Sequence, residues 1–458
     1  MINSSLIKEL KSILGSENVF TKKTELVSYS YDSQPESALP GVVVHVSDKA
    51  EIVAVVKLAS AHGIPLVARG AGSGMTGGSV PERGGIVLNL ERMNKIIHLN
   101  VEDRMCSVQP GVVTGEIQKR AEENGLFYPP EPASAKFSTI GGNVAESAGG
   151  LGCVKYGLTR DFVAGLEYVT SCGDIVRTGV YTNRESPFNV GNLVIGSEGT
   201  LGIISEIALR LIPLPAGRVT VLALFRNLIA AAKASNAVLS SGVGPSVLEF
   251  MDDRCIHTVR EYAGVDISDD AGALLIVELD GDEDALSAGE KKLINVLNEH
   301  ETIELKCAKT NEDRALIWKL RKSLSPAIAR IAPLKFNEDI CVPISLIPDI
   351  CSYVAKLAEK HVLNVVTFGH SGDGNIHVNF MTHRERHDEV ARVKKSISEL
   401  FREVVRIGGT LSGEHGIGIS KRAYIGFALD ETTIDFEKKV KKAFDPGEIL
   451  NPGKIFPM

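Results

Sequence analysis

The first half of the chain alternates between short apolar runs and amphipathic stretches. Near the N-terminus, apolar residues recur at helical spacing and predict a short amphipathic helix, whose apolar face is formed by Leu6, Ile7, Leu10, Ile13 and Leu14. The pattern then predicts strands at 41–47, 64–70, 84–90 and 105–108, and helices at 49–62 and 114–124. Gly125 ends the last of these helices. This βαβ-rich pattern continues to about residue 213, where Pro213 and Pro215 predict a domain boundary.

From about residue 217 the pattern of apolar and polar positions changes. Strands and helices alternate there, and several predicted strands carry polar residues, as strands at a sheet edge do. The predicted strands cover 219–225, 273–281, 301–308, 335–343 and 364–370. The predicted helices cover 226–240, 282–299, 311–331, 345–360 and 383–407. This succession predicts an α+β domain in which helices flank an antiparallel sheet.

Composition and charge narrow the class of protein. The chain has 458 residues, a net charge of −7, 44% hydrophobic and 23% charged residues, which are ordinary values for a globular protein. The absence of a basic stripe argues against nucleic-acid binding. No apolar run reaches the roughly 18 residues that span a bilayer. Lys8, Glu9 and Lys11 interrupt any signal-peptide core. We therefore expect a cytoplasmic protein.

The seven cysteines are scattered along the sequence. They are Cys106, Cys153, Cys172, Cys255, Cys307, Cys341 and Cys351. No C-x-x-C pair occurs, which argues against a zinc ribbon and an iron–sulfur cluster in this chain. We expect reduced thiols.

A glycine-rich loop at 69–78 is the first sign of chemistry. Gly72, Gly74 and Gly77 satisfy the G-x-G-x-x-G pattern, but a dinucleotide fingerprint also requires a helix at the loop. Here Pro81 and then another strand follow, so the sequence argues against a Rossmann fold. Glycine-dense backbone can still direct several N–H groups at one anion, such as a pyrophosphate. The alternative is a tight, exposed turn.

This loop and two later segments resemble the vanillyl-alcohol oxidase / p-cresol methylhydroxylase superfamily. The similarity is strongest to its D-lactate dehydrogenase, D-2-hydroxyglutarate dehydrogenase and glycolate oxidase flavin-subunit branch. The segments read ARGAGSGMTGGSVP, STIGGNVAESAGGLGCVKYGLTRDFV and IGSEGTLGIISEIALRL, and the resemblance extends to the NPGKIF tail. It implies a two-subdomain FAD-binding domain at 1–213, a substrate-binding cap domain with a metal site at 214–425, and a C-terminal segment at 426–458 that returns to the FAD domain.

The resemblance also implies which residues bind FAD. They are Arg69, Gly70, Ala71, Gly72, Ser73, Gly74, Met75, Thr76, Gly77, Pro130, Thr139, Gly142, Asn143, Gly149, Glu198, Gly199, Ile204 and Asn451. Many members of the family attach FAD covalently to a histidine in or near the first loop. Residues 69–80 contain no histidine, and the nearest is His62. We therefore expect non-covalent FAD.

A histidine pair in the second half predicts a metal site. Asp373-Gly374 is a strong signal for a two-residue hairpin turn, which would place His370 directly opposite His377. Glu414, between flexible glycines, is the best third ligand, and a His₂Glu set with open positions is a catalytic rather than a structural site. Zn²⁺ suits these ligands, as do Mn²⁺ and Fe²⁺. The resemblance assigns the same three positions to a divalent metal.

Further candidate catalytic residues surround this pair. Asn379 lies two residues past His377 and shares its strand face. A neutral imidazole such as that of His415 can take a proton from an alcohol, and the resemblance gives His415 the role of general base. It also matches Arg321 and Lys335 to residues that hold the substrate carboxylate. Ser325 falls where the 2-hydroxyglutarate branch has a threonine that contacts substrate.

Together these features predict an FAD- and metal-dependent dehydrogenase of D-2-hydroxy acids. In this interpretation His415 removes the hydroxyl proton and a hydride passes to flavin N5. D-Lactate is the first expected substrate, and glycolate and D-2-hydroxyglutarate are the next. Electrons would pass to an electron-transferring flavoprotein, an iron–sulfur subunit or a quinone at the membrane surface, and a homo-oligomer is a further expectation. The alternatives are a flavin-free metallohydrolase and a non-catalytic flavin subunit that only transfers electrons.

Overall fold

The chain folds into two compact units. The computed structural model describes residues 2–179, 188–263 and 267–457. Unit 1 combines Met1–Ala148, Leu158–Leu214 and Glu414–Met458, and unit 2 combines Gly149–Gly157 and Pro215–Gly413. The functional division predicted at 213/214 and 425/426 stays a prediction. The chain returns to unit 1 at Glu414, so the SGEHGIG segment changes units after its first two residues.

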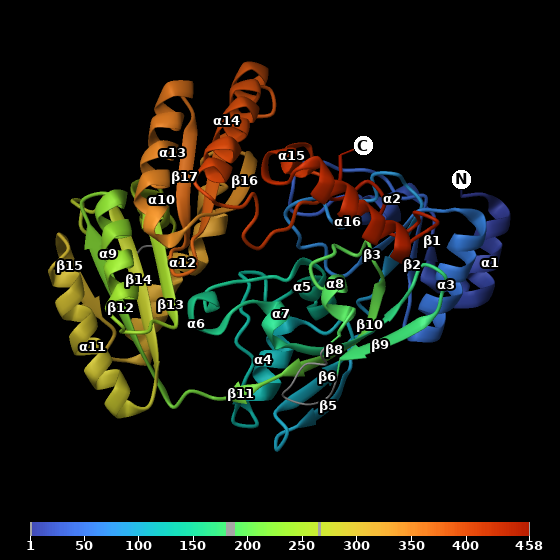
Figure 1. Cartoon of the computed structure of the whole chain (residues 1–458), viewed down its shortest axis with the longest axis horizontal. Coiled ribbons are helices and arrows are strands. Elements are labelled where there is room, and N and C mark those ends of the chain that lie inside the picture. Colours follow the sequence, from blue (N-terminus) through green and yellow to red (C-terminus); the bar gives the residue numbers. More distant parts are fainter. Residues whose placement is uncertain (1, 180–187, 264–266, 458) are drawn as a thin grey trace. The chain divides into compact units, whose positions relative to one another are not determined.

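Unit 1 begins with a small sheet of order β1-β2-β4-β3. Figure 1 labels β1, β2 and β3 of this sheet. Its strands are β1 (Val19–Phe20), β2 (Val42–His45), β3 (Leu66–Arg69) and β4 (Ile86–Asn89). Strands β2, β4 and β3 run parallel, joined through helix α3 (Lys49–His62), as the βαβ pattern predicts. Helix α1 (Ser4–Leu14) buries Leu6, Leu10 and Leu14 against this layer, whereas Ile13, expected on the apolar face, is 39% exposed.

The second sheet of unit 1 corrects the βαβ interpretation. Its order is β5-β6-β10-β8-β9, and all its pairings are antiparallel. The strands are β5 (Ile96–Asn100), β6 (Met105–Val108), β8 (Val163–Val169), β9 (Ile175–Gly179) and β10 (Ile203–Arg210). Short turns join β5 to β6 and β8 to β9, and such turns can only join antiparallel strands. The βαβ pattern therefore ends at β4.

Further helices and strands of unit 1 lie outside its two larger sheets. They are α2 (Lys23–Leu26), α4 (Thr114–Glu122), β7 (Leu126–Phe127), α5 (Ile140–Glu146), α7 (Thr159–Phe162), α8 (Gly191–Val194), β11 (Ile212–Pro213), α15 (Ile425–Ala428) and α16 (Glu431–Phe444). The C-terminal segment contacts the first sheet and the loop that precedes β10. Leu450 forms a parallel bridge with Leu66 of β3, and Lys441 of α16 donates to the carbonyl oxygen of Thr200, just before β10.

Unit 2 is built on one seven-stranded sheet of order β15-β12-β14-β13-β17-β18-β16. The strands are β12 (Gly217–Phe225), β13 (Val247–Asp252), β14 (Ala273–Gly281), β15 (Thr302–Cys307), β16 (Leu334–Cys341), β17 (Asn364–His370) and β18 (Asn375–Thr382). Every pairing is antiparallel, so the predicted α+β domain with an antiparallel sheet is confirmed.

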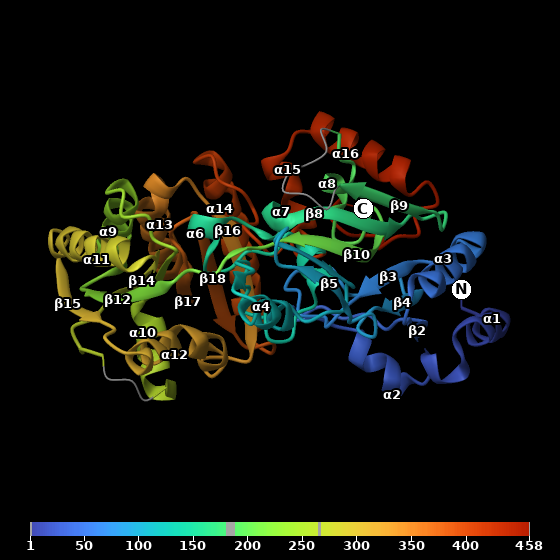
Figure 2. The same ribbon diagram turned by 90° about the horizontal axis from the view of Figure 1, so that it is seen from below.

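Helices cover both faces of this sheet, as Figure 2 shows. One face carries α9 (Leu228–Ser240), α11 (Glu283–Asn298), α13 (Ile347–His361) and α14 (His387–Arg406). The other carries α10 (Asp253–Ala263) and α12 (Asn311–Ile328), which pack on a core that includes Leu224, Met251 and Leu324. Helix α6 (Cys153–Tyr156), from the short segment Gly149–Gly157, contacts β13. The sequence pattern did not predict β13 or α10.

The hairpin of β17 and β18 has a register different from the predicted one. His370 lies opposite Asn375, and Phe368 lies opposite His377. The prediction failed because the connection uses four residues, Ser371 to Gly374, and Ser371 is held by hydrogen bonds to Ser235 and to the carbonyl oxygen of Leu248. A slip of two residues keeps the side chains on the same face. The histidines therefore stay on one face as diagonal rather than direct neighbours.

All seven cysteines are free thiols, as expected. Within the described ranges, no helix has the length and apolar character needed to cross a membrane.

Candidate active site

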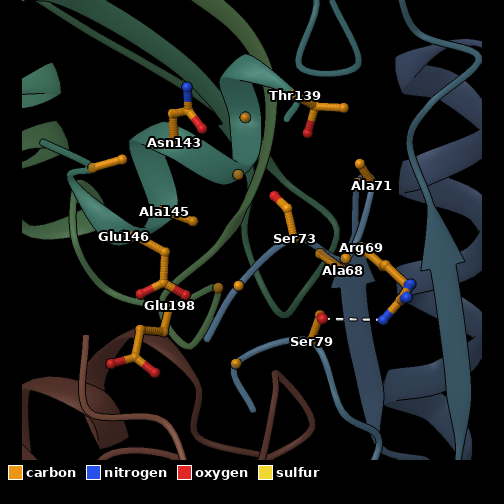
Figure 3. A pocket seen from close by; sticks show the side chains of 18 of the residues that line it. Ala68, Arg69, Ala71, Ser73, Ser79, Thr139, Asn143, Ala145, Glu146 and Glu198 are labelled. Carbon is orange, nitrogen blue, oxygen red and sulfur yellow. Dashed lines mark hydrogen bonds between the residues drawn. The ribbon is translucent and has the colours of Figure 1, made fainter. Parts of the chain in front are cut away.

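A cavity of about 220 Å³ lies in unit 1 (Figure 3). Three chain segments line most of it: the glycine loop from Ala68 to Ser79, the stretch from Pro132 to Ala148 that includes α5, and the stretch from Val194 to Ile204. Glu414 and His415 complete the lining. These are the segments in which the FAD motifs were recognised.

Most of the expected FAD-binding residues line this cavity. They are Arg69, Gly70, Ala71, Gly72, Ser73, Gly74, Met75, Thr139, Gly142, Asn143, Glu198, Gly199 and Ile204. Thr76, Gly77, Pro130 and Asn451 belong to unit 1 but lie outside the lining, and Gly149 belongs to unit 2. Lining residues that the sequence reasoning missed include Pro110, Ser134, Glu146 and Ser197.

The glycine loop is packed too closely at Gly70 for a side chain to fit. A Cβ on Gly70 would stand 2.0 Å from Oγ1 of Thr139, so a side chain there would collide with the opposite wall. All the residues from Gly70 to Gly74 are glycine, alanine or serine, so this part of the lining consists of backbone and small side chains. A long ligand with anionic groups, such as the FAD pyrophosphate, fits this lining.

The segment between β1 and β2 anchors the loop. The Ser33 amide donates to the carbonyl oxygen of Gly74 over 2.9 Å. Asp32 accepts a hydrogen bond from the Gln34 amide at 3.0 Å, and burial raises the pKa of Asp32 to about 6. On the loop itself, Arg69 donates to Oγ of Ser79 at 3.0 Å. Sequence reasoning missed Asp32, which lies in a stretch without periodicity.

Two carboxylates meet at one end of the cavity. Oxygens of Glu146 and Glu198 both come within 3 Å of the position that a Cβ on Gly416 would take, and Figure 3 shows the two side chains together. Glu198 accepts hydrogen bonds from the amides of Ile417 (2.7 Å) and Gly418 (2.8 Å), while burial raises its pKa. Glu198 therefore fixes the backbone that follows His415.

The glycine loop holds the same segment from the other side. Oγ1 of Thr76 donates to the carbonyl oxygen of His415 at 3.0 Å, and the carbonyl oxygen of Thr76 accepts from the Ile419 amide at 2.7 Å. Gly418 has a φ of +50°, and a Cβ there would stand 2.2 Å from the Thr76 carbonyl oxygen. His415, the candidate base, is thus carried by backbone bonded directly to the candidate FAD loop.

Asn451 joins three parts of unit 1. Its Nδ2 donates to the carbonyl oxygens of Gly78 and Glu198, each at 2.7 Å. It therefore lies behind two of the lining segments rather than in the lining.

Unit 2 carries the other candidate residues on one face of its sheet. We define the polar face by Glu249 of β13, His370 of β17, His377 and Asn379 of β18, and Lys335, Asn337 and Asp339 of β16. These residues alternate along their strands and pair across them, so their side chains point to the same side. Asn337 donates to the side-chain oxygen of Asn379 at 2.5 Å. Neighbouring positions on this side, such as Met251 and Val366, are apolar core.

The two histidines of the polar face are arranged as metal ligands would be. Their ring centroids are 5.3 Å apart with planes at 85°, and their Nε2 atoms are 3.5 Å apart. Two nitrogens bound to one tetrahedral Zn²⁺ at roughly 2.0–2.1 Å would be about 3.4 Å apart. The pair therefore fits a single ion without rearrangement. On its other side, Nδ1 of His370 is hydrogen-bonded to Glu249.

Arg321 and Lys335 offer positive charge on the same side of the sheet, Arg321 through its contact with Glu249 and Lys335 farther along β16, opposite Met381. Nε of Arg321, on α12, donates to Glu249 at 2.6 Å, and its guanidinium lies 5.0 Å from the ring centroid of Phe368. Burial lowers the pKa of Lys335, and among the described residues its ammonium group has no ion-pair partner. Ser325, one turn after Arg321, is exposed.

Glu414 directly follows Gly413, a residue that is hydrogen-bonded to the polar face. The amide of Gly413 donates to Oδ2 of Asp339 at 3.0 Å, and Asp339 lies opposite His377 between β16 and β18. Glu414 is the next residue, and its carboxylate is 3.8 Å from the His415 ring.

Comparisons with known proteins agree with the sequence motifs. A family model described as an FAD binding domain matches residues 40–179, and one described as FAD linked oxidases, C-terminal domain, matches residues 214–455. The chain is 37% identical to the glycolate oxidase subunit GlcD of Bacillus subtilis, over 100% of this chain and 97% of that protein. It is 34% identical to the D-lactate dehydrogenase of Anaerostipes hadrus, over 91% and 90% of the two chains.

A third relative and a solved structure extend this result. A D-2-hydroxyglutarate dehydrogenase of Stutzerimonas stutzeri is 31% identical over 100% of both chains. The crystal structure of p-cresol methylhydroxylase with bound substrate has a TM-score of 0.83 at 18% identity, covering 98% of this chain and 96% of that one, which establishes the shared fold. The expected superfamily and fold class are confirmed. The chain belongs to the FAD-linked oxidases, and it is an FAD-binding oxidoreductase of the group that contains glycolate oxidase subunits, D-lactate dehydrogenases and D-2-hydroxyglutarate dehydrogenases.

Proposed function

We propose that this protein is a metal-dependent dehydrogenase of small 2-hydroxy acids, with D-lactate oxidised to pyruvate as the first candidate reaction. The observation that carries the proposal is the polar face of unit 2. There, Lys335 and two histidines share one side of a sheet that is otherwise apolar, and Arg321 of α12 is bonded to Glu249 on the same side. A 2-hydroxy acid needs both a cation for its carboxylate and a group that polarises its hydroxyl.

FAD would occupy the cavity of unit 1. When bound, it supplies a two-electron acceptor for the hydrogen on the substrate α-carbon. The loop from Arg69 to Met75, Thr139 and Asn143 would hold it. His415 is the one histidine in the described lining, which contains no cysteine or tyrosine. Because His415 is proposed as the base, we propose that FAD binds non-covalently. Heat or acid denaturation should then release all the flavin into the supernatant.

A divalent metal, Zn²⁺ before Mn²⁺ or Fe²⁺, would be held by His370, His377 and Glu414. The spacing of the two Nε2 atoms supports the histidine ligands. The peptide link of Glu414 to Gly413, which is bonded to the polar face at Asp339, supports the third. Such an ion supplies a Lewis acid that lowers the pKa of a bound hydroxyl group.

The remaining candidate residues bind substrate and move the proton. Glu249 accepts the hydrogen bond of the Arg321 Nε, and we propose that the two terminal amino groups of Arg321 bind the substrate carboxylate in bidentate fashion. Lys335 adds a second positive charge and Asn379 a hydrogen-bonding amide. His415 accepts the hydroxyl proton, and the hydrogen bond from Thr76 to its carbonyl oxygen keeps its backbone in place.

Electrons must then leave the protein. We propose an acceptor outside this chain, either an electron-transferring flavoprotein, an iron–sulfur subunit or a quinone. The scattered free cysteines support this, because they offer no ligand set for a cluster within the chain. A cytoplasmic location, with contact to the membrane surface through a partner, and a homo-oligomeric state belong to the same proposal.

Anaerobic visible spectroscopy tests the reaction. The flavin absorption bands of the purified protein should bleach on addition of D-lactate and persist with L-lactate. Glycolate and D-2-hydroxyglutarate are added to separate samples, because relatives named for each share this fold and at least 31% of the sequence. Faster bleaching by glycolate would move the assignment to that acid.

Removal of the metal tests whether the reaction depends on it. Dialysis against a chelator should stop bleaching while the flavin stays bound, and Zn²⁺ or Mn²⁺ should restore it. If none of the acids bleaches the flavin of metal-loaded protein, the dehydrogenase proposal is wrong and a non-catalytic electron-transfer subunit replaces it.

A further inference from the structure

Glu249 is a carboxylate buried at the centre of the seven-stranded sheet. It lies on β13, directly opposite His370 of β17, and its side chain is fully inaccessible to solvent. An isolated carboxylate in such a place would cost several kcal/mol, so it persists only where donors satisfy it.

The two oxygens of Glu249 serve two different functional side chains. Oε2 accepts a hydrogen bond from Nε of Arg321 at 2.6 Å. Oε1 is hydrogen-bonded to Nδ1 of His370. The candidate carboxylate binder and a candidate metal ligand, on α12 and β17, therefore meet at one side chain.

We propose that Glu249 is a positioning residue that orients both the substrate-binding Arg321 and the metal-binding His370. This inference rests on the proposed function. With the Nδ1 proton of His370 donated to Glu249, the lone pair of the imidazole lies on Nε2, the atom 3.5 Å from Nε2 of His377. Carboxylate–histidine pairs of this kind fix the tautomer and ring orientation of a metal ligand.

The same contact sets the direction of the guanidinium. Nε of Arg321 is hydrogen-bonded to Glu249, and Cζ of Arg321 lies 5.0 Å from the ring centroid of Phe368. These two contacts restrict rotation of the guanidinium group. Its terminal amino groups are then available to a carboxylate in a fixed direction. One buried side chain would thus couple the place where the substrate carboxylate binds to the place where its hydroxyl is polarised.

The variant Glu249→Gln tests this coupling, with Glu278→Gln as the matched control. Glu278 is an equally buried carboxylate on the same side of the sheet, where it accepts from Thr220, Arg314 and Trp318 rather than from site residues. Metal-depleted holoprotein is titrated with Zn²⁺ and with Mn²⁺ to obtain Kd. Flavin reduction by the best 2-hydroxy acid then gives KM and kcat separately.

Glu249→Gln should raise the metal Kd by roughly 10–100-fold and raise KM together with it, while the FAD content stays unchanged. Glu278→Gln should leave both constants within about twofold of wild type, whatever its effect on Tm. If Glu249→Gln behaves like Glu278→Gln, the inference is wrong although the proposed function stands. If wild-type protein binds no metal or reduces no flavin, both are wrong.

A second variant tests the inference if Glu249→Gln fails to fold. Glu249→Asp keeps the buried charge but shortens its reach by one methylene group, so it should also raise Kd and KM. Unchanged constants in a folded Glu249→Asp protein would overturn the inference. Arg321→Lys separates the two halves of the coupling, because it should raise KM and leave the metal Kd unchanged. A parallel change in metal Kd would contradict the separate roles given to the two oxygens.

Discussion

The cavity of unit 1 is lined largely by backbone and small side chains from three contiguous segments, whereas the polar face of unit 2 consists of ionisable and amide side chains from four strands. The first arrangement suits a large cofactor that is recognised by shape and by many amide groups. The second suits a small substrate that is recognised by a few strong charges. In the proposed function, FAD binding in unit 1 would therefore be spread over many weak contacts, whereas substrate binding in unit 2 would depend on a few single side chains.

Substitution of His415 should have the largest effect on the rate of flavin reduction. His415 is the proposed general base, and it lines the cavity of unit 1 rather than the polar face of unit 2. His415→Ala should slow flavin reduction by substrate by about 10²–10⁴-fold, the usual contribution of a general base. FAD content should stay at the wild-type level. Anaerobic stopped-flow measurement of flavin absorbance checks this, with His62→Ala on the exposed end of α3 as the control. Reduction at the wild-type rate would remove His415 from the mechanism.

Added bulk should damage unit 1 where loss of a side chain does not. Gly70→Ala places a methyl group within 2.0 Å of Oγ1 of Thr139, and overpacking of this kind costs about 1–3 kcal/mol. The purified variant should lose most of its FAD, as the ratio of flavin to protein absorbance will show. Gly426→Ala has open space around the new methyl group and should keep its FAD. Full occupancy in Gly70→Ala would mean that the loop moves freely.

Unit 2 should respond to pH through Lys335. Burial lowers its pKa, so the folded protein loses this proton at a lower pH than a solvated lysine does. At pH values between the lowered pKa of Lys335 in the folded protein and its ordinary pKa in the unfolded chain, the unfolded chain binds more protons than the folded protein. Lys335 therefore makes the free energy of unfolding rise with pH in this range. Substrate binding changes in the opposite direction, because a neutral amine does not attract a carboxylate. KM should rise severalfold as pH passes the lowered pKa.

The substitution Lys335→Arg should flatten that rise, since arginine stays charged over the whole range. Lys322→Arg, at an exposed position of α12, should leave the wild-type profile unchanged. A KM that is independent of pH in wild-type protein would show that Lys335 does not bind the substrate carboxylate.

The smallest expected effect concerns the bond between the glycine loop and the segment of His415. Thr76→Val removes a hydrogen bond worth about 1 kcal/mol, so flavin reduction should slow about fivefold. Thr76→Ser keeps the hydroxyl group and should stay near the wild-type rate. Equal rates in the two variants would show that the bond does not influence His415.

The contrast between the units also explains what the sequence could reveal. The FAD loops are contiguous, so their glycines appear in the sequence as readable motifs, and most of the expected residues line the cavity. Helix α3 and strands β6 and β14 were predicted with their observed bounds, because each has clear periodicity and clear ends.

The polar face depends on pairing between distant strands, which periodicity does not encode. Strand β13 went unpredicted because Glu249 interrupts its short apolar run, and the role of that residue was missed with it. The hairpin register was wrong by two residues, since the hydrogen bonds of Ser371 that lengthen the turn come from α9 and β13. Asp339 was missed for the same reason, because only the pairing of β16 with β18 brings it to His377.

The bridge between Leu66 and Leu450 has a consequence for biosynthesis. Strand β3 is at the edge of its sheet, and its outer partner is made only after all of unit 2 has been translated. At about 5–20 residues per second, the residues of unit 2 delay that partner by on the order of 10–40 s. During this interval the edge of β3 is open to pairing with other chains. The ribosome-bound chain should therefore be more prone to aggregate before the segment around Leu450 is translated than after it.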